Sequence, residues 1–385
     1  MSLTEVKHQG PAQRTLQRAL CGDRVHHAYI FHGPDGVGKE VLANGLAQVL
    51  LCSSPVTNEL GSDDAQTVGV DSLRVGCGKC DDCRMVAAKS HPDLHLVYRQ
   101  LNREHPDSTV RKRKGLEISV DVMRYFVIER VGLRSARGLA KVFIVREADR
   151  ITRQAQNALL KTLEEPPGRT VLILLVRSLD RLLPTTLSRC QVVRFDPLPI
   201  EFVRGKLGEL LPDLPPEQVE WYARCSEGSL GLAHERAGDK WYELNQRIVN
   251  ILSALSGRTI SEAIKTWTEE SKDLGAGYRK RDPDITDTEA TRRGLKAIFQ
   301  LGATWYGDLL RCRDDNSPML VNATHKAHIE EAAKRVDPQR VASIISRIVQ
   351  AERQLDLNAY APLVLETLLS DLAAVAAGDA ASAGA

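Results

Sequence analysis

Residues 27–40 read HAYIFHGPDGVGKE, and this stretch decides the fold of the first half of the chain. Its first six residues form a short apolar run, and the glycine-rich segment Gly33–Lys39 follows at once. Beyond it, Val41–Cys52 repeats apolar residues at helical spacing. A strand, a glycine loop and a helix in this order are typical of a phosphate-binding unit. We therefore predict a phosphate loop of nucleotide-binding type.

The loop fits the pattern G-x-x-x-x-G-K, in which backbone N–H groups converge on phosphate oxygens. We predict that Gly33, Gly36, Gly38 and Lys39 bind phosphate, with Lys39 on the β and γ phosphates. Position 40 is Glu, where the pattern requires a Ser or Thr hydroxyl for Mg²⁺. A carboxylate there adds negative charge beside a triphosphate. The alternative is a chance glycine turn.

Two further runs indicate more of the same sheet. Lys141–Val145 and Thr170–Val176 are nearly continuous in branched apolar residues, which suits parallel strands buried on both faces. Between them, Thr152–Glu165 predicts an amphipathic helix that ends at Pro166-Pro167. The alternation over residues 1–195 indicates an α/β domain whose parallel sheet is flanked by helices.

The residues after Lys141–Val145 are unusual for a nucleotide hydrolase. This strand should end in an acidic pair that holds Mg²⁺ and polarises water, but Arg146 and Glu147 stand there. An arginine cannot ligate a cation, so we expect the Mg²⁺ site to be lost at both Glu40 and Arg146. The alternative for Arg146 is that it only caps the strand in solvent. Hydrolysis by this chain alone is not expected, whereas ATP binding without hydrolysis stays open.

The second half of the chain has a different pattern. Pro197 and Pro199 predict a linker, short helical stretches follow, and the periodicity is helical almost throughout from Trp241 onward. We therefore predict four regions: the α/β domain at 1–195, a small helical domain at 196–240, an all-helical domain at 241–376 and a disordered tail at 377–385.

Three polar stretches interrupt this organisation. Ser53–Leu73 is rich in Ser, Asp, Gly and Thr, and Gly275–Thr288 is polar and charged, so we predict loops or insertions at both. Arg111–Lys114 is a run of four basic residues. A solvated loop is its default interpretation, and contact with a nucleic-acid phosphate is the alternative.

Four cysteines have metal-ligand spacing. Cys52, Cys77, Cys80 and Cys83 form C-x24-C-x2-C-x2-C, and two overlapping C-x-x-C steps place thiolates on a tight knuckle. We predict that these four residues bind one structural Zn²⁺, because a closed Cys₄ set leaves no open coordination position. A thioredoxin-like redox pair is the alternative, but three stepped cysteines do not match a single C-x-x-C.

Composition limits the remaining function classes. The 385 residues are 43% hydrophobic and 26% charged, which is ordinary for globular proteins and excludes a fibrous or wholly disordered chain. Lys and Arg number 52 against 50 Asp and Glu, so no global charge marks a nucleic-acid or membrane binder. No window reaches the about 18 apolar residues of a membrane span, and the start lacks a signal-peptide pattern. We expect a cytoplasmic protein without membrane contact.

Ser188-Arg189-Cys190 lies between LLPTTL (182–187) and the apolar strand Val192–Phe195. By itself, this context describes a surface arginine in a turn between a helix and a strand. The role of Arg189 therefore depends on the rest of the sequence.

Six motifs in one order give the sequence a family resemblance. HAYIFHGPDGVGKE, LLC…CGKCDDC, HPDLHLV, ISVDVMR, NALLKTLEEPP and LSRC resemble the delta-prime subunits of the bacterial DNA polymerase III clamp loader and the related gamma/tau motor subunits. The resemblance implies a P-loop AAA+ module, a small lid and a helical collar. It also implies a five-subunit ring with gamma/tau and delta as partners, which loads the sliding clamp onto primed DNA as part of the polymerase III holoenzyme.

Departures from the motifs separate the motor from the non-motor members. A motor subunit should keep Ser or Thr at position 40, Asp at position 146 and an arginine at position 231, where this chain has glycine. These differences favour the non-hydrolysing, delta-prime members. The resemblance further implies that Arg189 reaches a neighbouring subunit's ATP site as an arginine finger.

Two alternatives remain from the sequence. One is a gamma/tau-type ATPase in which Glu40 and Glu147 hold Mg²⁺ between them. The other is a zinc-stabilised AAA+ DNA-binding protein that acts without other loader subunits.

Overall fold

A computed structural model describes residues 3–313 and 319–376 of the chain. The predicted tail at 377–385 lies outside the described residues. The chain divides into two compact units. The first comprises Met1–Pro199 with Gly228–Gly231, and the second comprises Ile200–Glu227 with Leu232–Ala385.

The first unit is built on a five-stranded parallel sheet with the order β4-β5-β6-β1-β7. Its strands are β1 (Ala28–His32), β4 (Leu94–Val97), β5 (Lys141–Val145), β6 (Thr170–Val176) and β7 (Gln191–Arg194). Every residue of β5 and β6 is buried, as their continuous apolar sequences predict. The parallel α/β fold predicted from the sequence is confirmed.

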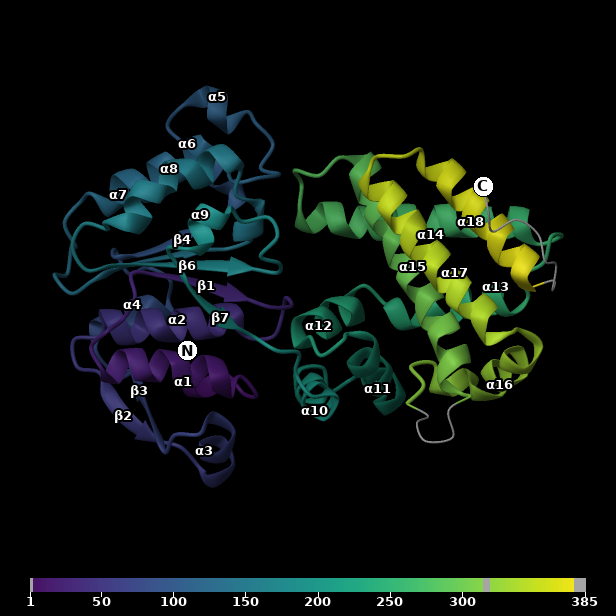
Figure 1. Cartoon of the computed structure of the whole chain (residues 1–385), viewed down its shortest axis with the longest axis horizontal. Coiled ribbons are helices and arrows are strands. Elements are labelled where there is room, and N and C mark those ends of the chain that lie inside the picture. Colours follow the sequence, from purple (N-terminus) through teal and green to yellow (C-terminus); the bar gives the residue numbers. More distant parts are fainter. Residues whose placement is uncertain (1–2, 314–318, 377–385) are drawn as a thin grey trace. The chain divides into compact units, whose positions relative to one another are not determined.

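Helices cover both faces of this sheet (Figure 1). One face carries α1 (Gly10–Cys21), α2 (Lys39–Leu51) and α4 (Asp81–Ala87). The other carries α5 (Ser108–Arg111), α6 (Val120–Met123), α7 (Glu129–Val131), α8 (Arg153–Glu164) and α9 (Pro184–Leu187). On this second face, Leu159 of α8 and Val127 pack with Ile30, Phe143 and Leu174 of the sheet in one apolar core.

Of the two alternatives for Ser53–Leu73, a loop or an insertion, the loop is wrong. This segment contains β2 (Val56–Glu59), α3 (Ser62–Val68) and the first half of β3 (Ser72–Val75), and the two strands pair in antiparallel fashion. Leu73 and Val75 are buried, and β3 lies against α1 and α2. A few apolar residues at alternate positions therefore hold a mostly polar sequence in a small hairpin.

The second unit is helical, as predicted. It contains α10 (Ile200–Leu210), α11 (Pro216–Cys225), all but the first two residues of α12 (Leu230–Gly238), α13 (Trp241–Ser253), α14 (Ile260–Arg281), α15 (Asp287–Arg311), α16 (Lys326–Arg335), α17 (Pro338–Asp356) and α18 (Ala361–Ala376). Trp267 of α14 and Trp305 of α15 are among its largest fully buried side chains. The division near residue 240 into lid and collar stays a prediction. No helix in residues 3–313 and 319–376 is long and apolar enough to cross a membrane.

The prediction of a loop at Gly275–Thr288 is also wrong for most of that stretch. Helix α14 continues through Gly275 to Arg281, and α15 begins at Asp287. A Cβ on Gly275 would lie only 3.0 Å from the backbone of Ala290, so the glycine lets α14 and α15 approach closely. The basic last turn of α14 also suits a helix C-terminus. Packing against α15 therefore overrides the low helix propensity of glycine.

Candidate functional site

The predicted phosphate loop connects β1 to the N-terminus of α2. Gly36 and Gly38 have φ values of +69° and +105°, which favour glycine. A Cβ on Gly33 would lie 2.3 Å from the carbonyl oxygen of Phe195. The backbone therefore requires glycine at all three predicted positions. That these residues bind phosphate stays a prediction.

Lys39 is folded into its own loop. Its side chain is 7% exposed, and Nζ donates to the carbonyl oxygens of Gly33 and Pro34, the latter at 2.5 Å. Nζ also lies 3.3 Å from Oδ1 of Asp35. Burial lowers the pKa of Lys39, and the Asp35 carboxylate opposes that effect. The loop carbonyls thus occupy the ammonium group that the motif assigns to phosphate.

The two positions that depart from the Mg²⁺-binding pattern contact each other. Nη2 of Arg146, at the end of β5, donates to Oε1 of Glu40 in the first turn of α2. Nζ of Lys89 lies 3.8 Å from the same oxygen. The interpretation of Arg146 as a solvent-facing cap is wrong. A guanidinium neutralises the carboxylate where the motif places a hydroxyl and a metal.

The other acidic residues of this region are paired with arginines too. Glu147 has a left-handed backbone with φ of 47°, and its carboxylate accepts from Nε of Arg99 at 2.8 Å. Nε of Arg150 lies 3.2 Å from the other oxygen of Glu147. Nε of Arg177 lies 3.2 Å from Oδ2 of Asp35. Internal cations thus neutralise the carboxylates that could otherwise attract Mg²⁺.

Residues 228–231, which are far from the glycine loop in the sequence, lie against it in the structure. The backbone N–H of Gly231 donates to the carbonyl oxygen of Gly36 at 3.2 Å, and Oγ of Ser229 donates to that of Asp35 at 2.6 Å. A Cβ on residue 231 would lie 2.7 Å from Cα of Gly36. The arginine expected of a motor subunit at position 231 therefore has no room in this arrangement.

The four predicted cysteine ligands come together. Cys52 follows the last residue of α2, Cys77 and Cys80 lie between β3 and α4, and Cys83 lies in the first turn of α4. All four sulfur atoms lie within 4.8 Å of one another. Two Sγ–Sγ distances are 3.8 and 4.0 Å. Zinc with Zn–S bonds of about 2.3 Å in a tetrahedron requires about 3.8 Å between sulfurs, so the cluster fits Zn²⁺.

Backbone N–H groups donate hydrogen bonds to the sulfurs of this cluster. Sγ of Cys52 accepts from the N–H of Cys77 at 3.3 Å, and that of Cys80 from the N–H of Cys83 at 3.4 Å. Burial would raise the pKa of Cys80, but hydrogen bonds, chiefly that from Cys83, outweigh it and bring the pKa to about 6. Burial raises the pKa of Cys52 and Cys83. A bound metal would have to displace the remaining thiol protons.

Arg189 lies in the turn between α9 and β7, and its side chain is 32% exposed. Its Nε donates to Oε1 of Glu164 at 2.8 Å, and Nη2 donates to the same oxygen. Nη1 donates to the carbonyl oxygen of Thr185 at 2.9 Å. The sequence predicts the turn correctly but gives no sign that Glu164 binds the arginine.

Gln156 is a second residue of α8 that the sequence does not single out. It is 1% exposed, and its Nε2 donates to the carbonyl oxygen of Arg181 at 3.1 Å. Its Oε1 accepts from the backbone N–H of Leu183 at 2.8 Å. A glutamine on the buried face of an amphipathic helix is the only sequence signal for this role. Gln156 thereby anchors the segment that leads to Arg189.

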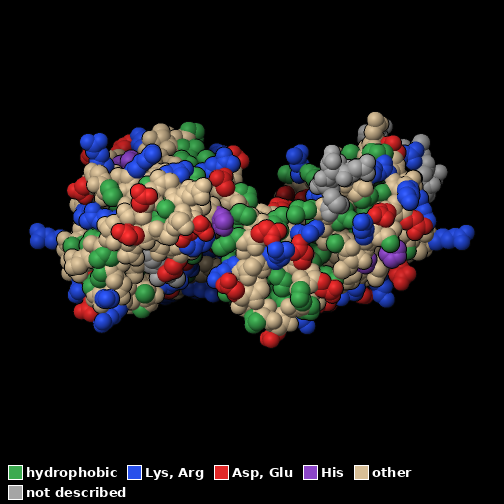
Figure 2. Space-filling model, turned by 90° about the horizontal axis from the view of Figure 1, so that it is seen from below, with side chains coloured by type: hydrophobic (Ala, Val, Ile, Leu, Met, Phe, Trp, Pro, Cys, Tyr) green, Lys and Arg blue, Asp and Glu red, His purple; other side chains and the backbone are tan. Residues whose placement is uncertain are grey.

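The basic run at Arg111–Lys114 is partly neutralised. Nη1 of Arg111 donates to the carbonyl oxygen of His105 at 2.8 Å, and Nη1 of Arg113 lies 2.7 Å from Oδ2 of Asp121. Lys112 and Lys114 are exposed and, in the described part of the chain, have no ion-pair partner. The face shown in Figure 2 mixes positive and negative side chains. Phosphate contact by the two lysines stays a prediction.

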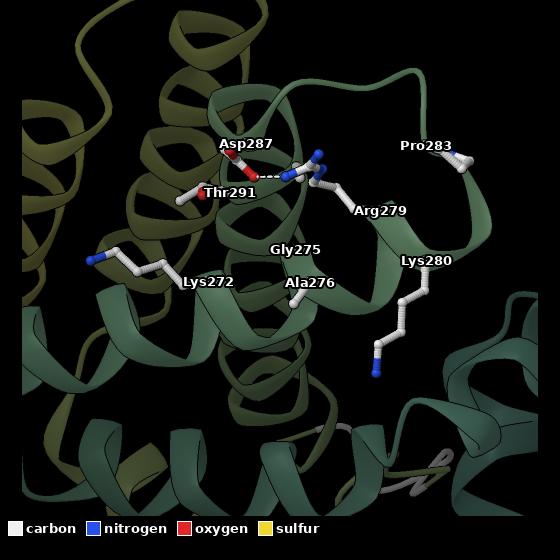
Figure 3. A pocket seen from close by; sticks show the side chains of 9 residues that line it. Lys272, Gly275, Ala276, Arg279, Lys280, Pro283, Asp287 and Thr291 are labelled. Carbon is white, nitrogen blue, oxygen red and sulfur yellow. Dashed lines mark hydrogen bonds and ion pairs between the residues drawn. The ribbon is translucent and has the colours of Figure 1, made fainter.

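A cavity of about 540 Å³ lies along α14 and α15 in the second unit. Three of its lining residues are basic: Lys272, Arg279 and Lys280. Figure 3 shows Lys272 and Lys280 pointing away from each other, while Arg279 pairs with Asp287. The positive groups do not converge, so the cavity lacks the geometry of an anion site.

Comparison with known proteins gives consistent matches. The family model described as "DNA polymerase III, delta subunit" matches residues 8–199. The DNA polymerase III subunit delta' of Pseudomonas aeruginosa is 34% identical over 264 residues, covering 67% of this chain and 70% of that protein. The Bacillus subtilis subunit delta' is 24% identical over 364 residues, covering 94% and 95%. The Escherichia coli subunit tau is 30% identical over 233 residues, covering 60% of this chain and 31% of tau.

Proposed function

The chain belongs to the delta-prime family of DNA polymerase III clamp-loader subunits, and we propose that it acts in the loader without hydrolysing ATP. Family membership implies other clamp-loader subunits as partners. We place gamma/tau and delta beside it in a five-subunit ring. Through that ring it would act on the sliding clamp and on primed DNA.

The ion pair between Arg146 and Glu40 is the observation that supports a non-hydrolysing role. An arginine is charged at every accessible pH, so Arg146 cannot give up its ion pair with Glu40 by losing a proton. Mg²⁺ would have to displace a fixed cation to reach Glu40. The gamma/tau alternative also needs Glu147, whose carboxylate would have to leave Arg99 and Arg150.

ATP binding without hydrolysis remains an expectation for the glycine loop. Binding would require Nζ of Lys39 to exchange the carbonyl oxygens of Gly33 and Pro34 for phosphate oxygens. The segment at Gly231 would also have to leave Gly36. Both changes oppose nucleotide entry, and neither is needed for the role that we assign to Arg189.

We assign Arg189 to a neighbouring subunit's ATP site as a trans-acting arginine finger. It lies in the Ser188–Cys190 motif, its side chain is partly exposed, and its turn is anchored by buried Gln156. A positioned guanidinium neutralises charge on the γ-phosphoryl oxygens in the transition state, which accelerates hydrolysis about 10³–10⁵-fold in GTPases. The chain would thus complete a site whose metal and phosphate loop belong to its neighbour.

The test is Arg189→Ala in a loader reconstituted from its purified subunits. We expect clamp- and DNA-stimulated ATP hydrolysis to fall at least about tenfold, a conservative share of the range for arginine fingers. Ring assembly and zinc content should not change. Arg189→Lys should restore little activity, because an ammonium lacks the planar fork.

Arg194→Ala is the matched control, since Arg194 is a more exposed arginine on the adjoining strand and pairs with Asp196. Wild-type hydrolysis and clamp loading by the Arg189→Ala complex would contradict the finger role. Steady-state ATP hydrolysis by the purified chain tests the other half of the proposal. Turnover at the rate of a motor subunit would favour the gamma/tau alternative.

A further inference from the structure

Glu164 binds the side of the Arg189 guanidinium that carries Nε and Nη2, which is the side best suited to bind an anion. Nε and Nη2 of Arg189 both donate to Oε1 of Glu164. These two nitrogens form one side of the planar fork with which arginine binds carboxylate and phosphate in bidentate pairs. A phosphate that approaches this side must therefore displace Glu164.

The remaining nitrogen is engaged as well. Nη1 donates to the carbonyl oxygen of Thr185 at 2.9 Å and to Oγ of Ser188 at 3.3 Å. All three nitrogens of Arg189 thus have acceptors in the same chain. The guanidinium is held in place, and a new ligand has to exchange with one that is already bound.

The backbone that leads to Arg189 is more firmly held than the Arg189 side chain itself. Gln156 is buried and binds backbone groups of Arg181 and Leu183. In contrast, Glu164 is 50% exposed and Arg189 is 32% exposed. An exposed ion pair contributes little stability and is readily broken. The arginine side chain can therefore exchange partners while its turn stays in place.

We propose that Glu164 is a positioning residue that competes with the neighbour's nucleotide phosphate for Arg189. This inference rests on the proposed finger role of Arg189. Without nucleotide at the neighbouring site, the carboxylate keeps the guanidinium paired. The γ-phosphate then takes Nε and Nη2 from Oε1 of Glu164, because a phosphate carries more negative charge than a single carboxylate.

The first experiment uses the free chain and needs no partner. Phenylglyoxal modifies guanidinium groups, and peptide mass spectrometry measures the rate at Arg189. We expect Glu164→Gln to raise this rate at least twofold, because the amide carries no charge to hold the cation. Glu165→Gln is the matched control, since Glu165 is the next residue along the chain and is exposed. It should leave the rate unchanged.

The second experiment measures ATP hydrolysis by the reconstituted loader. We expect Glu164→Gln to lower the half-saturating ATP concentration about two- to fivefold, the range that an exposed ion pair supports. The maximal rate should stay within about twofold of wild type. Glu165→Gln should change neither quantity. A purely structural role for Glu164 would lower the maximal rate without lowering the half-saturating concentration.

The outcomes separate this inference from the proposed function. If Arg189→Ala leaves hydrolysis at the wild-type rate, the finger role itself is wrong. If Arg189→Ala lowers hydrolysis while Glu164→Gln behaves like Glu165→Gln in both experiments, only the competition by Glu164 is wrong. A fall in maximal rate with Glu164→Gln also overturns it. In an Arg189→Ala background, Glu164→Gln should have no further effect on hydrolysis.

Discussion

The two ends of α2 deal with negative charge in opposite ways. At its start, the carboxylate of Glu40 is neutralised by Arg146, with Lys89 nearby. At its end, the sulfur of Cys52 lies 3.8 Å from that of Cys80 and accepts hydrogen bonds from the backbone N–H groups of Ser54 and Cys77. An arginine thus supplies the counter-charge at the first end, whereas a metal would supply it for the four cysteines at the other.

The contrast follows from the chemistry of the side chains at each end of α2. A carboxylate and a guanidinium satisfy each other's charge and hydrogen bonds, so an arginine can take the place of Mg²⁺ beside Glu40. No side chain supplies the bonds that Zn²⁺ makes to four sulfurs. At the start of α2, Lys39 and Glu40 are thus paired within the chain, whereas the four cysteines near its end have the arrangement of a metal-ligand set.

The largest effect on stability should come from removing one cysteine of the cluster at the end of α2. Cys80→Ser removes one sulfur ligand, and structural zinc contributes directly to the folding of its local unit. We expect zinc content to fall from one ion per chain to almost none, and the melting temperature to fall by about 10 °C. Elemental analysis and thermal unfolding measure the two quantities.

Cys21→Ser is the matched control, because Cys21 is exposed and lies outside the cluster. It should leave zinc content and melting temperature unchanged. Full zinc occupancy in the Cys80→Ser protein would show that the cluster is not the metal site.

An intermediate effect on stability should come from breaking the ion pair between Glu40 and Arg146 at the start of α2. Arg146→Glu places two carboxylates side by side, and we expect it to lower the free energy of unfolding by about 1–2 kcal/mol, with partial exposure limiting the loss. Exchanging the charges, with Glu40→Arg and Arg146→Glu together, should recover at least half of that loss. Urea denaturation measures both variants.

Arg194→Glu provides the comparison for a surface charge reversal. Arg194 is largely exposed, so this change should stay within about 0.5 kcal/mol of wild type. If the charge exchange recovers no stability, the contact between Glu40 and Arg146 does not determine the effect.

The sequence predicts those parts of the molecule whose signals are local. The glycine loop and the buried strands β5 and β6 each occupy a short stretch, and the structure places them as predicted. The four cysteines are spread over residues 52–83, and the structure brings their sulfurs together. The pairing of Glu40 with Arg146 joins residues 106 positions apart, so no local pattern reveals it. The sequence shows that both residues depart from the motif, but not that they neutralise each other.

The errors have a similar physical origin. Gly275 is unfavourable in an isolated helix, yet α14 passes through it because the close approach of Ala290 requires a missing Cβ. The polar hairpin β2–β3 forms because Leu73 and Val75 are buried. In both cases, contacts with other elements outweigh the composition of the segment. The ion pair of Glu164 with Arg189 likewise depends on how α8 packs beside the turn.

The smallest effect should come from positive charges that the chain leaves unneutralised. Lys112 and Lys114 are exposed, and no described ion-pair partner balances their positive charge. If they contact DNA phosphates in the loader, changing both to Ala should weaken DNA binding about two- to fivefold. It should also reduce the slope of log affinity against log salt by about 1–2. Fluorescence anisotropy over a salt series measures both quantities.

Lys206→Ala is the control for this measurement, because Lys206 already pairs with Glu209. An unchanged salt slope in the Lys112→Ala, Lys114→Ala loader would assign these lysines to a solvated loop.

The contact between Glu40 and Arg146 also makes the effects of changes at the two positions depend on each other. Thr at position 40 alone would leave Arg146 without its carboxylate. Asp at position 146 alone would set two acids against each other. Each single change therefore carries a cost in stability that the double change, Glu40→Thr with Arg146→Asp, would avoid. A Mg²⁺ ligand set could thus be introduced here more readily by two simultaneous substitutions than by either one first.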